Sequence, residues 1–453
     1  MAVFNNKKKL SRRKFLGVST TAAAGGVVGG LVVGGLAGYF TSQATTSPET
    51  IAKTKTVTGA GKTETESQII ISNETENTSL SSEPASEPTQ EPEPAPESAP
   101  EPTPDSTSEK TFYKKSDVGT DVIQLTSKPS HDRIFYQEPN YFSPDNSKFL
   151  FYSRDTDDKG EIEKAGIYLL DLNTGNITLL KNRPFGFMPT WSKDGKEVYV
   201  GENSKILAIN IKTLEERTIN IPTDSTDFSW IVSLHLNPSG DRLLFVESGQ
   251  ETHKALSTIK TDGSDYRKLF IADQETVFVL GHPIFVDDNT ILFLTRGENR
   301  NSRGDFNKPY LITLDGKLTR IPVTCSHYDV NPKGDKILCG QDGYIIDLEG
   351  NKLKEFPEIH GHGVWAPDGD VFLLTGDPVP VPKESQYFGK IVIMKFSSDE
   401  IYSLVSHENT YDSSIEVHVQ PNAQFSRDGK HIIYESDRNQ MQNIDLYLVE
   451  VPE

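Results

Sequence analysis

Histidines at one position of a repeated sequence phrase are the residues best suited to chemistry. His282, His327 and His362 each lie three residues before the end of an apolar segment, and Asn422 holds the same position in the last copy. The chain has only 10 histidines, so three in successive copies are unlike a chance distribution. Imidazoles brought together could bind a metal ion or act as general acid and base. They could equally be structural, with each ring hydrogen-bonded to neighbouring backbone.

The phrase that contains them occurs seven times. Each copy has an apolar strand, a tight turn such as Ser-Arg-Asp-Gly at 426–429, and a second apolar strand. The turns follow Phe142, Trp191, Leu236, Phe285, Val330, Trp365 and Phe425. A period of about 47 residues that contains only strands predicts an all-β fold, a seven-bladed β-propeller with four-stranded blades.

A propeller fold predicts where the histidines should meet. The first strand of each blade lines the central channel, so equivalent positions on successive blades converge near the axis. His282, His327, His362 and Asn422 should therefore form an arc at one channel mouth. A strand at about 121–126 precedes the first copy, whereas the last copy ends without a fourth strand. We expect this N-terminal strand to complete the last blade and close the ring.

The first 110 residues differ in composition from the repeats. Ser11-Arg-Arg-Lys-Phe-Leu, followed by an apolar run to Phe40, is typical of a twin-arginine export signal. The run is also long enough to remain as a membrane anchor. Residues 42–110 are rich in Thr, Ser, Glu and Pro, which predicts a disordered linker. The sequence thus predicts a signal or anchor at 1–41, a linker at 42–110 and an extracytoplasmic propeller at 111–453.

Charge limits the kinds of partner. The net charge is −19, and nucleic acid is not expected to bind because phosphate requires a basic surface. The expected partners are an acidic oligosaccharide or a protein ligand at the channel mouth of a monomer, with membrane contact only through the N-terminal segment. An anionic ligand would need local positive charge, which four arginines could supply: Arg133, Arg183, Arg296 and Arg300.

Two cysteines, Cys325 and Cys339, lie on opposite strands of one predicted hairpin. They could pair in an oxidising compartment, but their offsets from the turn differ by a few residues. The spacing therefore favours two free cysteines over a disulfide.

The propeller resembles the oligogalacturonate lyases over nearly its whole length. The most specific matching phrases are Leu280-Gly-His-Pro, Cys325-Ser-His and His407-Glu-Asn-Thr, each in the corresponding blade. The resemblance implies β-elimination on short uronate oligomers. It also implies a divalent cation, Mn²⁺ or Ca²⁺, that acidifies the proton next to the uronate carboxylate.

The resemblance also implies roles for individual residues. His327 matches the family's metal ligand in blade five. Where the family has His-Pro-His-Pro at the start of blade seven, this chain has Gln420-Pro-Asn422-Ala, whose amide oxygens suit Ca²⁺ better than a transition metal. In blade four, Thr295-Arg296-Gly replaces the family's His-Glu-Gly, a region tied to its catalytic base. The implied metal ligands are His327, Gln420 and Asn422, and the implied catalytic residues are His282, His362 and Arg296.

Two functions remain open from the sequence. One is an exported lyase that acts on uronate oligomers. The other is a non-catalytic propeller that binds a glycan or a protein, which the altered blade-seven motif and the long linker favour. The sequence contains no Gly-x-Ser-x-Gly elbow, phosphate-binding glycine loop or zinc-binding cysteine cluster.

Overall fold

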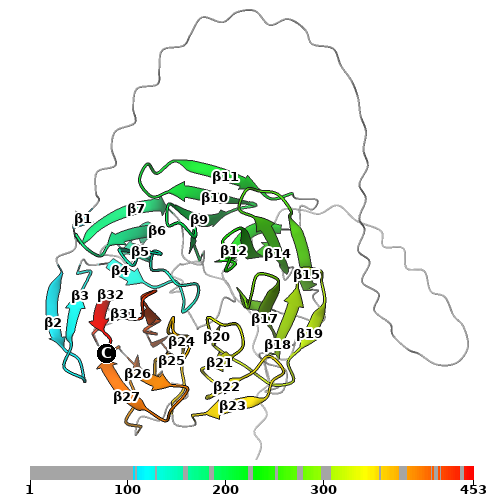
Figure 1. Cartoon of the computed structure of the whole chain (residues 1–453). Coiled ribbons are helices and arrows are strands. Elements are labelled where there is room, and N and C mark those ends of the chain that lie inside the picture. Colours follow the sequence, from blue (N-terminus) through cyan, green and yellow to red (C-terminus); the bar gives the residue numbers. More distant parts are fainter. Residues whose placement is uncertain are drawn as a thin grey trace, which may run out of the picture. The chain divides into compact units, whose positions relative to one another are not determined.

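The structure is a β-propeller. The computed structural model describes residues 106–107, 110–127, 130–156, 162–182, 188–222, 228–249, 254–272, 279–296, 308–356, 359–376, 385–409, 411–412, 417–418, 420–438 and 443–452. The described strands form seven antiparallel blades around an axis (Figure 1), which confirms the predicted all-β fold. The predicted signal and almost all of the linker lie outside the described residues. No helix in the described ranges is long and apolar enough to cross a membrane.

The first four blades follow one another along the chain, and each runs from the axis outward. Blade one contains β4 (Ser130–Arg133), β5 (Lys148–Thr156), β6 (Ile162–Asp171) and β7 (Asn176–Asn182), with β1 (Ser106–Thr107) on its outer edge. Blade two contains β8 (Thr190–Trp191), β9 (Glu197–Glu202), β10 (Lys205–Asn210) and β11 (Glu216–Asn220). Blade three contains β12 (Phe228–Leu236), β13 (Arg242–Gly249), β14 (Lys254–Lys260) and β15 (Arg267–Ala272). Blade four contains β16 (Val279–Phe285), β17 (Thr290–Arg296), β18 (Lys308–Thr313) and β19 (Leu318–Arg320).

The last three blades complete the ring. Blade five contains β20 (Tyr328–Val330), β21 (Ile337–Cys339), β22 (Tyr344–Ile346) and β23 (Lys352–Glu355). Blade six contains β24 (Gly363–Trp365), β25 (Val371–Leu374), β26 (Lys390–Lys395) and β27 (Ile401–Ser406). Blade seven contains β30 (Gln424–Phe425), β31 (His431–Ser436) and β32 (Asp445–Glu450), together with β3 (Asp121–Gln124) and β2 (Thr111–Lys115) from the N-terminal side. A separate pair, β28 (Tyr411–Asp412) and β29 (Val417–His418), lies in the connection between blades six and seven.

The repeated turn has a common hydrogen-bond pattern. In blade seven the Ser426 hydroxyl donates to Asp428 at 2.6 Å and accepts the amide of His431 at 3.0 Å. The glycine of the turn, Gly429, has a φ of 74°, a conformation that favours glycine. Blade two repeats the arrangement with a serine and an aspartate at the same places. Local turn chemistry therefore fixes where the first two strands of a blade separate.

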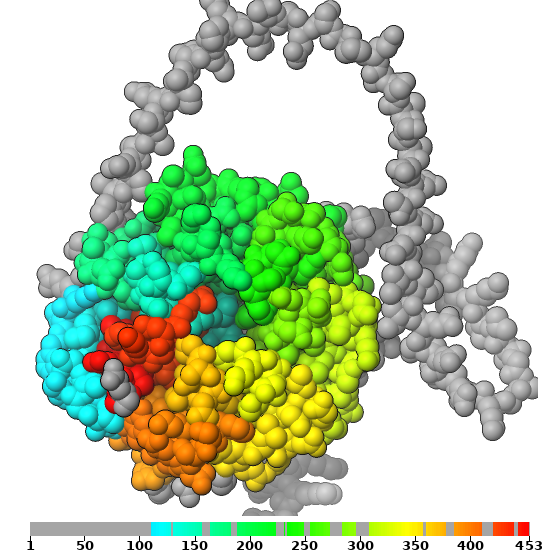
Figure 2. Space-filling model, viewed as in Figure 1, coloured from blue at the N-terminus to red at the C-terminus, as the bar shows by residue number. Residues whose placement is uncertain are grey.

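The N-terminal strand closes the ring as predicted. β3 pairs with β32 in antiparallel register, with Val122 opposite Val449, and Figure 2 shows the N-terminal propeller residues in contact with the C-terminal ones. The pairing continues where the Leu125 amide donates to the Leu446 carbonyl at 2.8 Å. β2 adds a fifth strand beyond β3, which the sequence did not predict. The edges that an open ring would expose are thereby covered.

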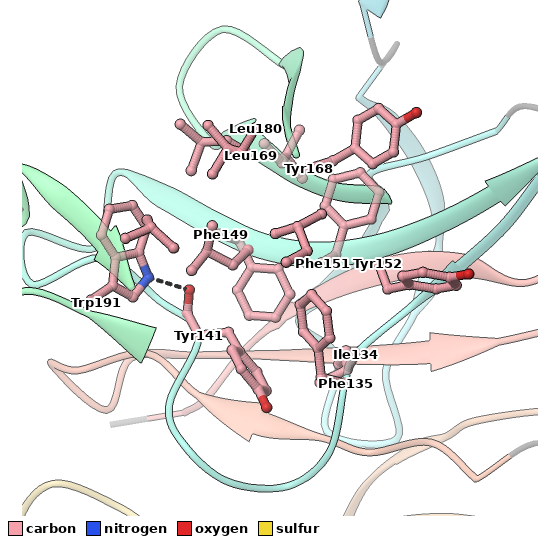
Figure 3. Close-up of a cluster of buried hydrophobic side chains, with 14 of the residues drawn as sticks. Ile134, Phe135, Tyr141, Phe149, Phe151, Tyr152, Tyr168, Leu169, Leu180 and Trp191 are labelled. Atoms are coloured by element: carbon pink, nitrogen blue, oxygen red, sulfur yellow. Dashed lines mark hydrogen bonds between the residues drawn. The ribbon is translucent and has the colours of Figure 1, made fainter. Parts of the chain in front are cut away.

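The interface between blades one and two is packed with aromatic side chains (Figure 3). Trp191 is 1% exposed, and its indole nitrogen donates to the Tyr141 carbonyl at 2.8 Å. Phe149 and Phe151 of β5 belong to the same cluster of buried side chains. Because an indole buried without an acceptor would lose a hydrogen bond, this contact both fills the interface and fixes the path of the chain at Tyr141.

Two buried acids, Asp132 and Asp445, lie at the seam between blades one and seven, and they are 3% and 2% exposed. Burial raises the pKa of Asp445 to about 7, the charge of Asp132 adds to the rise, and Arg438 opposes it. The folded protein thus binds this proton more tightly than the unfolded chain does. The contribution of Asp445 to the free energy of unfolding is therefore greatest at acidic pH and falls as the pH rises toward about 7.

Replacing Asp445 by asparagine is therefore expected to stabilise the protein at neutral pH. The free energy of unfolding should rise by on the order of 2 kcal/mol at pH 7, and its fall between about pH 4 and pH 7 should become shallower. Urea unfolding at a series of pH values measures both quantities. Asp399→Asn, which alters a fully exposed side chain, is the control. A pH profile that is the same in Asp445→Asn and the wild type would contradict this expectation.

Candidate functional site

Backbone conformation singles out the repeat position that the sequence identified. The residue three places before the strand end has a positive φ in three blades: 55° at Ser233, 50° at His327 and 41° at Asn422. In blade three the strand register also shifts between Val232 and His235. A left-handed conformation costs a non-glycine residue on the order of 1 kcal/mol. Such strain is common at functional positions, because it aims a side chain that a regular strand would point elsewhere.

Two of the predicted histidines make direct contact. Nδ1 of His327 and Nε2 of His362 are 2.7 Å apart, and the two rings are nearly perpendicular, with centroids 4.1 Å apart. The Gly340 amide donates to the His327 carbonyl at 3.1 Å. His362 is fully buried, whereas His327 is partly exposed. His327 is thus the member of the pair that a ligand at the channel mouth could touch.

Tyr136 of blade one reaches across the axis to this pair. Its hydroxyl lies 3.4 Å from Nδ1 of His327, and its ring packs edge-on against His362 at a centroid distance of 5.3 Å. Tyr136 lies between β4 and the first repeated turn, in the segment 134–141, where the sequence analysis assigned no site residue. The result is a cluster of two imidazoles and one phenol, which we call the axial cluster.

Arg133 and Asn422 meet at a buried acid, Glu435. Glu435 is 0% exposed, and its Oε1 accepts bonds from Arg133 at 3.0 Å and from Asn422 at 3.1 Å. Burial raises the pKa of Glu435, and Arg133 counteracts the rise. The charge of Arg133, which was expected to attract an anionic ligand, is therefore partly neutralised by Glu435. The side-chain oxygen of Asn422 is buried and accepts no hydrogen bond from the described residues.

A second pair of ionisable groups, Glu138 and Asp329, lies close to the axial cluster in sequence and in space. Burial raises the pKa of Glu138, and the neighbouring Asp329 charge raises it further; burial also raises the pKa of Asp329. Gln137, next to Glu138, donates to the Tyr328 carbonyl at 2.9 Å. Blade one is thus tied to the inner strand of blade five directly after Tyr136.

Glu138 also lines a small recess near the axis. The other lining residues come from the inner strands of blades three and four and from the segments next to the inner strands of blades one and two: Pro139, Met188, Ser233, Leu234, His235, Pro283 and Ile284. Pro139, Met188 and Ser233 hold the repeat position of the histidines in their own blades. The convergence of that position near the axis is therefore a property of the whole ring. Burial lowers the pKa of His235 to about 4, so its ring is neutral at physiological pH.

The prediction of free cysteines was wrong. Cys325 and Cys339 form a disulfide with a Cα–Cα distance of 5.0 Å. In the regular register of β20 and β21, Tyr328 and not Cys325 lies opposite Cys339. The left-handed conformation of His327, however, bends the chain just before β20. Tight hydrogen bonds from the amides of Asp342 and Gly343 to the Cys339 carbonyl turn the other strand immediately. The bend and the turn together remove the offset that argued against pairing.

The remaining predicted site residues are only partly described. The backbones of His282 and Arg296 lie in β16 and β17, but their side chains lie outside the described residues, as do Arg183 and Arg300. Gln420 is partly exposed. Their predicted roles stay predictions.

No family model matches the chain, and no curated protein sequence does. Solved structures match it well. An oligogalacturonate lyase in complex with manganese aligns with a TM-score of 0.61 and 19% identity, over 77% of this chain and 97% of that one. An oligogalacturonate lyase from Vibrio parahaemolyticus aligns with a TM-score of 0.61 and 18% identity, over 77% and 98%. The chain has the fold of these lyases. The resemblance that the motifs indicated is thus confirmed in the structure.

A TolB protein from Acinetobacter baumannii is a more distant neighbour of the chain than these lyases, with a TM-score of 0.38 and 12% identity, over 70% of this chain and 65% of that one.

The manganese in one of these lyases raises the question of whether the described residues could hold that ion. Among them, no group of three or more His, Cys, Asp or Glu side chains converges on a metal position. The two imidazole nitrogens at 2.7 Å are closer than the roughly 3 Å expected for two ligands with metal bonds of about 2.1 Å. The histidine pair therefore fits a shared hydrogen bond better than a shared metal ion. The ligand set His327, Gln420 and Asn422 stays a prediction, and no step below uses a metal.

Proposed function

We propose that the chain is an exported lyase that cleaves short acidic oligosaccharides by β-elimination at the axial cluster. The observation that supports it best is the contact between His327 and His362, with Tyr136 beside them, at the axis of a propeller that shares the fold of oligogalacturonate lyases. The shared fold alone does not imply the activity. The proposal therefore depends on what these side chains can do.

The chemistry requires two proton transfers. A base removes the proton from the carbon next to the uronate carboxylate, the electron pair forms a carbon–carbon double bond, and the glycosidic oxygen leaves and takes up a proton. His327 is the proposed base because it is partly exposed and its ring contacts another imidazole. His362, buried behind it, orients the ring and can share the proton. Tyr136 is the proposed donor to the leaving oxygen, since its hydroxyl lies 3.4 Å from His327.

The proposed setting is outside the cytoplasm. The twin-arginine motif and the long polar linker support export, with the propeller either released or held at the membrane by the apolar run. A substrate with several carboxylates would need the predicted arginines as well, and Arg300 and Arg183 remain proposed contacts for it.

Binding without catalysis is the second candidate function. It is favoured by the full burial of His362 and by the bond that links Arg133 to Glu435, which leaves less free charge for a uronate. In this alternative the axial cluster would have only a structural role and would support a surface that binds a glycan or a protein.

An ultraviolet assay for unsaturated products on oligogalacturonates tests the proposal, with binding of the same oligomers followed by calorimetry. We expect His327→Ala to lower kcat/KM by roughly 10²- to 10⁴-fold, the usual contribution of a general base. His431→Ala, at the start of β31 in blade seven, is the matched control and should leave the rate unchanged. Binding by the wild type without any product would favour the second candidate. If neither product nor binding were observed, acidic oligosaccharides would be excluded as ligands under both candidate functions.

A further inference from the structure

Three basic side chains share one face of the first hairpin in blade one. His131 lies opposite Arg154 in the register of β4 and β5, and Arg133 follows His131 by two residues. Side chains two residues apart on a strand point to the same face, and directly opposite side chains of antiparallel strands have Cβ atoms about 5 Å apart. All three residues are partly exposed, whereas the alternate residues of β4 are buried. We call this accessible side of the hairpin the basic face.

The positive charge of the basic face is only partly compensated. Arg133 pairs with the Glu435 carboxylate at 3.0 Å, but Nε of Arg154 is buried and has no hydrogen-bond partner among the described residues. Burial lowers the pKa of His131, and the charges of Arg154 and Arg133 lower it further. Like charges that face each other on neighbouring strands destabilise a sheet, and a buried guanidinium donor without an acceptor adds to that cost. An anion bound at this face would remove both penalties.

The charges of the basic face match an anion with a single negative charge. Glu435 offsets the charge of Arg133, and the lowered pKa keeps His131 neutral at physiological pH, so the charge of Arg154 remains. A carboxylate supplies one negative charge and two acceptor oxygens, which suit the paired N–H groups of a guanidinium and the N–H of a neutral imidazole. A phosphate monoester carries nearly two negative charges at neutral pH and would exceed the positive charge present.

The basic face continues along the chain into the axial cluster. β4 is the inner strand of blade one, and Tyr136 lies three residues after Arg133. Glu435 fixes the path between them, because its Oε2 accepts the Ile134 amide at 2.7 Å while its Oε1 accepts Arg133. The Cα atoms of His131 and Tyr136 are at most about 18 Å apart, the reach of five residues of extended chain. One elongated ligand can therefore contact both the basic face and the axial cluster.

We propose that His131 and Arg154 bind a carboxylate of an acidic oligosaccharide, with Arg133 held beside them by Glu435. The carboxylate belongs to a neighbour of the reacting sugar, because the reacting sugar lies at the axial cluster. The basic face is thus a second contact for the substrate of the proposed function, and the inference rests on that function for the identity of the ligand. Contacts away from the reacting carbon hold the substrate and the transition state equally well, so this face positions the oligomer without taking part in the chemistry.

Kinetics on trigalacturonate separate such a binding role from a catalytic one. Arg154→Gln should raise KM roughly 10- to 100-fold, the usual contribution of a hydrogen bond to a charged group, and should leave kcat little changed. The variant is expected to fold with the Tm of the wild type, because Nε of Arg154 has no described partner to lose. Arg217→Gln, on the outer strand β11 of blade two, is the matched control and should change neither constant. An unchanged KM in Arg154→Gln would overturn the proposal and leave the proposed function standing, since product would still form.

Imidazole ¹⁵N chemical shifts of His131 report the same contact without turnover. Trigalacturonate should move these shifts in the wild type, with His431 as the reference ring, and Arg154→Gln should abolish the movement. The fully methyl-esterified trimer, which has the same sugars without free carboxylates, should leave His131 unchanged. Movement that depends on Arg154 but occurs without any product would support the basic face and overturn only the proposed function. If the shifts of His131 did not move, or moved equally with the ester, the proposal would be overturned.

Discussion

Replacing Val122 by aspartate is expected to prevent stable folding of the propeller. Val122 lies in β3, is 0% exposed and faces Val449 in the closing sheet. It packs in a cluster that contains Leu404 of blade six and Tyr447 of blade seven. An ionised side chain there would lose the apolar burial of valine and would have no counter-charge, at a combined cost of roughly 4 kcal/mol or more.

Chemical unfolding followed by tryptophan fluorescence measures this loss. Val118→Asp is the matched control, because Val118 lies in the turn between β2 and β3 and is 39% exposed. The control should change the free energy of unfolding by less than about 0.5 kcal/mol. If Val122→Asp unfolded at the same urea concentration as Val118→Asp, β3 would contribute little to ring closure and the ring would be stable when open.

The strand order of the propeller was predictable because its signals are local. Each turn carries its own hydrogen-bonding side chains, as Ser426 and Asp428 show, and each is followed by an apolar strand. Closure by β3 was predictable from a missing strand at one end and a spare strand at the other. The fifth strand β2 was not predictable in the same way, because its Phe112 is 59% exposed and the strand lacks an apolar alternation.

The axial cluster was only half predictable. The shared repeat position correctly indicated that His327 and His362 would lie near each other, since they occupy adjacent blades. Tyr136 could not be found this way, because blade one departs from the repeat between β4 and Phe142, and the irregular segment there reaches the axis. Side-chain direction in such a segment depends on tertiary contacts, such as the bond from Trp191 to the Tyr141 carbonyl.

The disulfide was not predicted for a related reason, since it also depends on an irregular backbone. A register counted from the turn places the two cysteines out of step, and that count is correct for a regular hairpin. The left-handed residue at His327 makes the hairpin irregular, and histidine gives no reliable sign of that conformation in a sequence. The backbone feature that misled the pairing prediction also aims His327 at the axis.

Removing the disulfide should therefore affect stability and the axial cluster together. The bond closes a loop with a sequence separation of 14 residues, and loss of such a cross-link lowers the free energy of unfolding by about 3 kcal/mol. Cys325→Ala combined with Cys339→Ala should show this loss in urea unfolding. Reduction of the wild type should give a similar loss, while the same reductant should leave the double variant unchanged.

Removal of the disulfide should affect the axial cluster because Cys325 lies close to His327 in the chain. Cys325 lies two residues before His327, and Ser326 between them is held by a bond from its amide to Asp342 at 2.6 Å. Without the disulfide, hydrogen bonds such as this one and the bond from the Gly340 amide to the His327 carbonyl must hold the bend that directs the ring toward His362, so the imidazole contact should loosen. Imidazole ¹⁵N chemical shifts report that contact directly, and His431 serves as the reference ring. Unchanged shifts of His327 and His362 in the destabilised double variant would show that the bend is held by the blade-five strands, and that the cross-link serves stability alone.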